Sequence, residues 1–304
     1  MKTKIIAEKS KQLFNQLLEM SKGYKFNKKP QEQAESIGTA VKLLKANKSL
    51  NLYDLVKQLT DKAIIEYDVR GFLVDLIAAL SNKNQFEVIN IIINEKEKLI
   101  RYPYLDRHTI NKNYEYIKNM SILKFNTTSL KYLLSADIFT RECLHEWFLK
   151  TYSDYSIHNN HSGLLDTFFT KAIKSGIMDI ATIFNEAVKE TAPDYRTKQL
   201  IENIINNYIK GKYKAEVINN IFKHKNSKLN RTIAETLKNL KPSDILSILH
   251  SMVNAPEIKP EIKKQMVLFF FEPNMGKLSL PTSHGKLIVL KDNEEVFDKH
   301  GGCP

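Results

Sequence analysis

Five side chains that could bind a metal ion lie close together in the sequence: Cys143, His145, Glu146, His158 and His161. Thiolate, imidazole and carboxylate groups are the usual zinc ligands, and a zinc site needs three or four of them converging on one point. Cys143 and His145 are two positions apart on an expected helix, so their side chains diverge. Their spacing matches neither CxxC nor HExxH. The pattern favours a buried thiol beside a loop with two surface histidines, and we expect neither a metal nor a cofactor.

Two other arrangements bear on catalysis. Cys143 could serve as a nucleophile with a distant histidine, and Asp106-Arg107-His108 follows an irregular stretch. Such a triplet is more typical of a cap at the start of a helix. The sequence contains no GxSxG, GxGxxG or GxxxxGK[ST] motif, which excludes the common nucleophile-elbow and glycine-loop nucleotide sites. A non-catalytic protein is favoured, and an enzyme with a site in residues 100–163 remains the alternative.

Charge is distributed unevenly along the chain, whose net charge is +12. Residues 196–241, here called the basic segment, carry a net charge of +8, whereas residues 49–195 carry −2. A positive field of this kind attracts an acidic protein surface or a nucleic acid. We therefore predict these partner-binding residues: Arg196, Lys198, Lys210, Lys212, Lys214, Lys223, Lys225, Lys228 and Arg231. The competing interpretation is that the lysines only solvate outer helix faces.

RNA is the alternative ligand for the basic segment. Tyr208 and Tyr213 alternate with its lysines, as aromatic platforms for stacked bases would. Repeats that read RNA hold side chains at regular positions, and the units of this chain vary in length. A protein partner with an acidic surface is therefore favoured, and RNA binding stays open.

The elements that carry these residues are expected to be helices. Glycine and proline are scarce (10 and 9 residues), and apolar residues recur at i, i+3 and i+4 over most of the chain. Ser135 is expected to cap a helix that runs to about residue 151. The polar stretch 152–163 predicts a loop between two lobes, 1–151 and 164–272. Residues 273–304 form a short C-terminal tail, which is either a small hairpin or a mobile segment.

A recurring pattern suggests how the helices are arranged. The segments that begin at Leu73, Leu164 and Ile201 each contain an apolar helix, a short polar turn and a second helix. A single helix pair cannot bury its apolar face, so pairs of this kind stack on one another. We therefore predict an all-α fold: an antiparallel helix-pair solenoid in two lobes, with a concave face used for binding.

These units resemble known helical repeats. The turns AIKSG and YIKGK, and the pairs Ile183-Phe184 and Ile221-Phe222, are similar to pentatricopeptide and tetratricopeptide repeats. The varying unit length is more like that of HEAT repeats. The resemblance implies a scaffold that binds another macromolecule.

The C-terminal tail carries a second resemblance. Asp292, Glu294, Glu295 and Asp298 form an acidic cluster that looks like the secretion signal of effectors delivered by Dot/Icm type IV secretion systems. The abundance of lysine, asparagine and isoleucine fits an AT-rich intracellular bacterium. The resemblance implies an effector that passes from the bacterial cytoplasm into the host cytosol. Its partner would be a host factor or, as for metaeffectors, another effector.

Two further features concern localisation. The N-terminal sequence MKTKIIAEKSKQ lacks the apolar run of a secretory signal, and no stretch approaches the ~20 apolar residues of a membrane helix. The two cysteines, Cys143 and Cys303, are not expected to pair, which fits a reducing compartment. We therefore expect no membrane span.

Overall fold

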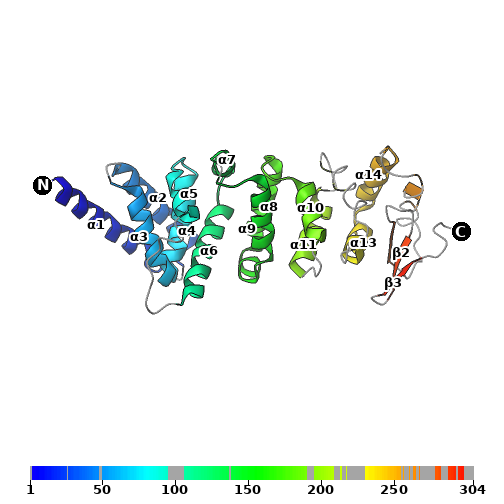
Figure 1. Ribbon diagram of the computed structural model, residues 1–304, viewed down its shortest axis with the longest axis horizontal. Coiled ribbons are helices and arrows are strands. Elements are labelled where there is room, and N and C mark those ends of the chain that lie inside the picture. Colours follow the sequence, from blue (N-terminus) through cyan, green and yellow to red (C-terminus); the bar gives the residue numbers. More distant parts are fainter. Residues whose placement is uncertain are drawn as a thin grey trace. The chain divides into compact units, whose positions relative to one another are not determined.

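The protein was studied as a computed structural model (Figure 1). The structure describes residues 2–25, 27–47, 50–94, 106–136, 138–189, 195–208, 213, 217, 230–254, 256, 260, 263–264, 267, 278–281, 287–291 and 294–297. Helices joined by short turns make up the described chain as far as residue 254, which confirms its all-helical character. Two compact units are present, and each is described separately.

The first unit comprises Met1–Glu142 and Gly163–Ile177. Its helices are α1 (Lys2–Ser21), α2 (Pro30–Ala46), α3 (Leu52–Ile65), α4 (Tyr67–Ser81), α5 (Glu87–Asn94), α6 (Arg107–Leu123) and α7 (Thr127–Ser135), followed by the second half of α9 (Tyr155–Lys174). Helix α4 is central and contacts α1, α2, α3, α5 and α6 (Figure 1). Ten of its residues are buried, as expected of a helix that is apolar on several faces.

The turn between α1 and α2 is held against one face of α4. The Asp68 carboxylate accepts hydrogen bonds from the backbone N–H groups of Gly23 and Lys25 at 3.0 and 2.9 Å. One turn further along α4, Gly71 lies under the aliphatic part of Lys25. A second turn further, Asp75 accepts a 2.9 Å hydrogen bond from the Tyr24 hydroxyl. Asp68, Gly71 and Asp75 therefore share a helix face that fixes the turn.

Two of the three predicted repeat turns lie in the described chain, and both have the same hydrogen bonds. After α4, Gln85 N–H donates to Leu80 O and Asn84 N–H to Ser81 O. After α9, Ile177 N–H donates to Ala172 O and Gly176 N–H to Ile173 O. This is the Schellman motif, which places one residue in the left-handed region. That residue is Asn84 (φ 65°) in the first turn and Gly176 (φ 67°) in the second.

The third predicted turn, at Gly211, lies outside the described residues. The shared turn geometry is common at helix ends and does not by itself test the repeat pattern. The stacking of the pairs into a solenoid stays a prediction.

The second unit comprises Cys143–Ser162 and Met178–Pro304. It contains most of α8 (Arg141–Ser153), the first half of α9, and the helices α10 (Ile180–Lys189), α11 (Tyr195–Tyr208), α13 (Asn230–Lys238) and α14 (Pro242–Val253). Helix α11 packs against α10 and α13. Its buried stripe includes Leu200, Ile201, Ile204 and Ile205, which repeat at helical spacing.

Two predictions about local structure are wrong. The predicted loop at 152–163 is instead almost entirely helical, with a kink at His161 (φ −141°, ψ 27°) inside α9. Ser135 ends α7 and does not cap the next helix, since α8 begins at Arg141.

The C-terminal tail contains three short strands: β1 (Leu278–Pro281), β2 (Leu287–Lys291) and β3 (Glu294–Phe297). They form an antiparallel sheet in the order β1-β2-β3, and β1 contacts α13. Leu280 pairs with Ile288, and Val289 with Val296. The tail is therefore a three-stranded meander, one strand more than a hairpin. Glu294 and Glu295 of the acidic cluster lie in β3, while Asp292 and Asp298 lie outside the described residues.

Candidate functional site: an aromatic and basic patch on α9 and α11

Two of the five residues considered as metal ligands, His145 and His158, are buried among the helices of the second unit. His145 is 5% exposed, and its Nε2 accepts a 3.1 Å hydrogen bond from the backbone N–H of Asp179, just before α10. His158 is 6% exposed, whereas Cys143 is exposed. The expected buried thiol with surface histidines is thus wrong for Cys143 and His158. Among the described residues, no three His, Cys, Asp or Glu side chains are grouped so that they could hold a metal ion.

The most exposed large aromatic side chains of the described chain lie on two helices of the second unit. Tyr155, the first residue of α9, is 72% exposed, and Tyr195, the first residue of α11, is 70% exposed. The guanidinium carbon of Arg196 lies 5.8 Å from the centre of the Tyr155 ring, within the range of a cation–π interaction. Lys198 is exposed on the same helix as Arg196. Tyr155, Tyr195, Arg196 and Lys198 are here called the aromatic–basic patch.

Hydrogen bonds connect the two helices that carry this patch. The Gln199 side-chain amide donates to the Tyr195 hydroxyl at 2.9 Å. Its carbonyl oxygen lies 2.7 Å from Nε2 of the buried His158, so the amide joins α9 to α11. The His158 ring in turn packs edge-on against Tyr152, with ring centres 4.9 Å apart. The Tyr195 hydroxyl thus has a partner on its own helix at the surface.

The electrostatics of the start of α11 favour an anion, while the exposed carboxylate of Asp154 lies next to Tyr155 in the sequence and accepts a hydrogen bond from Ile157 N–H. Tyr195, Arg196 and Lys198 all lie in the first turn or so of α11, and that turn contains no acidic residue. The N-terminal end of a helix already carries a partial positive charge and free N–H groups. The two cations therefore add to the positive potential of the helix end.

The structure places only part of the predicted partner-binding set. Arg196 and Lys198 belong to the patch, and Arg231 lies in α13, where its backbone alone is described. The remaining predicted residues lie outside the described chain: Lys210, Lys212, Lys214, Lys223, Lys225 and Lys228. Sequence reasoning missed Tyr155 and Tyr195. For Tyr195 a signal was available in the sequence, because its position does not lie on the apolar helix face that begins at Leu200.

One of the tyrosines proposed for stacking RNA bases is unsuited to that purpose. Tyr208 is 5% exposed, and its ring packs edge-on against Tyr213 with the centres 5.8 Å apart. A buried ring cannot offer its face to a base, so the prediction is wrong for Tyr208.

The alternative catalytic triplet is a helix cap, as its sequence suggested. The Asp106 carboxylate accepts hydrogen bonds at 2.8 Å from both the backbone N–H and the hydroxyl of Thr109. These bonds stabilise the charged form and lower the pKa of Asp106 below its usual value. Asp106 is thus the N-cap of α6, whose first residue is Arg107.

The chain was compared with known proteins in three ways. No protein-family model, no curated protein and no solved structure matches it. Among the residues that the structure describes, no helix combines the length and apolar character needed to span a membrane.

Proposed function

We propose that this protein is a non-catalytic scaffold that binds another protein through the aromatic–basic patch. The observation that carries the proposal is the pair of tyrosines that are 72% and 70% exposed beside Arg196. Tyrosine and arginine are enriched among the residues that dominate binding energy at protein interfaces. A tyrosine also offers a large contact area and loses little conformational entropy on binding.

Charge indicates the kind of partner. Arg196 and Lys198 begin the basic segment, whose net charge over residues 196–241 is +8. Such a surface steers an acidic partner toward the patch and accelerates association, while the aromatic contacts slow dissociation. We therefore propose an acidic protein surface as the partner.

The resemblance of the C-terminal acidic cluster to a secretion signal supports a proposal about where the protein acts. In this view the protein is a bacterial effector of the Dot/Icm type, secreted from the bacterial cytoplasm into the host cytosol. Its partner is then a host protein or a second effector whose activity it modulates. The cluster at Asp292, Glu294, Glu295 and Asp298 is the feature that supports this part.

The test is affinity capture with three forms of the full chain as bait. Wild type, the double variant Tyr155→Ala/Tyr195→Ala, and the control Leu246→Ala are each incubated with host lysate and with bacterial lysate. Leu246 is 60% exposed on α14 of the same unit, so it controls for the loss of an exposed apolar side chain. We expect a defined protein that is captured by wild type and Leu246→Ala in moderate salt, and lost with the double variant.

Two outcomes would contradict the proposal. If all three baits capture the same proteins, the patch is not the binding surface. If the captured material absorbs at 260 nm and is released by ribonuclease or by a modest rise in salt, the ligand is RNA.

A further inference from the structure

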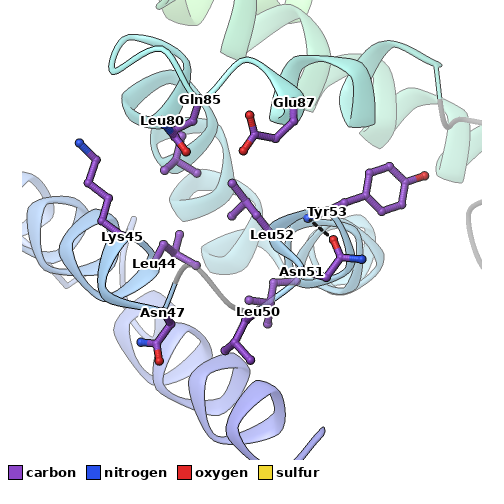
Figure 2. A pocket seen from close by; sticks show the side chains of 11 residues that line it. Leu44, Lys45, Asn47, Leu50, Asn51, Leu52, Tyr53, Leu80, Gln85 and Glu87 are labelled. Carbon is purple, nitrogen blue, oxygen red and sulfur yellow. Dashed lines mark hydrogen bonds between the residues drawn. The ribbon is translucent and has the colours of Figure 1, made fainter. Parts of the chain in front are cut away.

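The first unit contains a separate pocket at the ends of four helices, and it involves no residue of the aromatic–basic patch. The pocket has a volume of about 650 Å³ and is lined by the end of α2, residues 50–52, the start of α3, the end of α4 and residues that lead into α5 (Figure 2). Its volume lies within the usual range for sites that bind small molecules or peptide side chains.

The floor of this pocket is apolar. Leucine side chains supply it, contributed by residues 44, 50, 52, 55 and 80. Leu55 and Leu80 are each 1% exposed, and Leu44 and Leu50 are 8% and 7% exposed. Because these four leucines are almost entirely covered, the half-buried Leu52 offers most of the apolar surface on which an aliphatic chain could lie.

Two charged residues line the pocket, Lys45 and Glu87. Figure 2 shows the Glu87 carboxylate directed toward the side chain of Leu52, and the Lys45 ammonium group directed away from it. Within the described chain, no hydrogen bond or ion pair involves the Glu87 carboxylate or the Gln85 amide beside it. A carboxylate above an aliphatic floor complements a side chain that has an apolar stem and a cationic end, as lysine and arginine do.

We propose that this pocket binds a lysine or arginine side chain presented by a peptide segment of a partner protein. The aliphatic stem lies on the leucines, and the cationic group reaches Glu87. A lysine side chain does not fill a pocket of about 650 Å³, so the flanking peptide occupies the rest. The side-chain amide of Gln85, which also lines the pocket, is available to hydrogen-bond that peptide's backbone.

This inference stands apart from the proposed function, since it concerns other residues in another unit and a partner group of opposite charge. If the patch does not bind a partner, the pocket inference still stands, and the reverse is also true. The first probe is the peptide acetyl-Leu-Lys-Leu-amide, titrated into the isotope-labelled full chain and followed by the NMR shifts of backbone amides. We expect the largest shifts at residues 50–53 and 85–87.

Comparison probes and variants isolate each element of the proposal. The same peptide with an acetylated lysine lacks the charge, and pentylammonium lacks the peptide. We expect acetylation of the peptide or Glu87→Gln in the protein to weaken binding by roughly two- to fivefold, the effect of one exposed ion pair. Glu8→Gln, which changes an exposed carboxylate on α1, should leave binding unchanged.

Three results would overturn the proposal. Equal binding of the acetylated peptide, or an unchanged affinity in Glu87→Gln, would show that no cation is recognised. Pentylammonium binding as tightly as the peptide would assign the pocket to free amines. Shifts confined to other residues would place the peptide elsewhere.

Discussion

Replacing Gly71 with alanine tests how the turn between α1 and α2 is seated on α4. Helix propensity alone predicts that Gly71→Ala stabilises the protein by about 1 kcal/mol, because glycine is the poorer helix former. The structure predicts that this gain is largely cancelled. A Cβ atom at Gly71 would lie 2.3 Å from Cε and 2.6 Å from Cγ of Lys25, so the turn or the side chain must move.

The expected magnitude follows from the two opposing effects. Overpacking a contact costs about 1–3 kcal/mol, and the cost should lie at the low end here because Lys25 is half-buried and its flexible stem can move aside. Set against the gain in propensity, Gly71→Ala should therefore leave the free energy of unfolding nearly unchanged. In a Lys25→Ala background the obstruction is gone, and the same substitution should stabilise the protein by about 1 kcal/mol. The double-mutant cycle isolates the contact as an interaction energy of about 1 kcal/mol.

The assay is urea unfolding followed by far-ultraviolet circular dichroism, with the four proteins of the cycle measured together. Gly38→Ala is the matched control, because a Cβ at this α2 glycine would meet nothing within 4 Å. It should stabilise the protein by about 1 kcal/mol. Equal stabilisation by Gly71→Ala in the wild-type and Lys25→Ala backgrounds would refute the close approach of the Lys25 stem to α4.

Three further predictions concern groups whose environment the structure defines. Burial, together with the charge and hydrogen bond of Asp75, raises the pKa of Tyr24 above 10.0. The wild type should therefore lose its extra stability over Tyr24→Phe as the pH rises above 10. A difference in unfolding free energy that stays constant from pH 8 to 11 would contradict this. For Asp106, whose pKa is lowered, stability depends on pH in the opposite direction. The wild type should be more stable than Asp106→Ala above pH 3.8, and acid titration of both proteins should show this difference vanish below that value. Gly176→Ala should cost about 1 kcal/mol in thermal or urea unfolding because φ is 67°, while Gly163→Ala, with open space around its Cβ, should not destabilise α9.

Most helices could be predicted from the sequence because their apolar residues repeat at helical spacing and their ends carry clear signals. Pro30 at the first position of α2 is such a signal. The turn at Ser175-Gly176 was equally readable, since glycine readily adopts the left-handed conformation that ends α9.

Residues 155–163 were misjudged for a reason that lies in tertiary structure. Asparagine, serine and histidine are weak helix formers, so the local signal favoured a loop. Ile157 and His158 are nevertheless buried, at 2% and 6% exposure, and the hydrogen bond from His158 to Gln199 joins this stretch to α11. Packing and a bond to a residue 41 positions away outweigh propensity here, and neither could be seen in the local sequence.

The candidate site was only half visible for a similar reason. Charge is a property of the residue, so Arg196 and Lys198 could be selected from composition alone. The exposure of Tyr155 and Tyr195 depends on which face of each helix packs against its neighbours. The same holds for Tyr208, whose aromatic ring suggested RNA stacking until its burial was known.

The first turn of α11 gives one more reason to assign binding to this end of the helix. Basic residues near a helix N-terminus oppose the helix dipole, and acidic ones are normally preferred there. Helix α11 has Arg196 and Lys198 at this end and no acid in its first turn. Arg196 contacts the Tyr155 ring, whereas among the described residues no hydrogen bond or ion pair involves the Lys198 side chain. A local rule broken without a structural gain, as at Lys198, is typical of a functional position. Lys198→Gln should therefore raise the unfolding free energy by about 0.3–1 kcal/mol and weaken capture of the acidic partner.

A charge at the opposite end of a helix provides the control for this trade-off. Lys174 lies in the last turn of α9, where a cation is favourable, so Lys174→Gln should lower stability by a similar amount and leave capture intact. Urea unfolding midpoints and capture yields of the two variants show whether Lys198 serves partner binding or the stability of the fold. If Lys198→Gln is less stable than wild type, the lysine supports the fold. In that case its position at the start of α11 is no argument for binding.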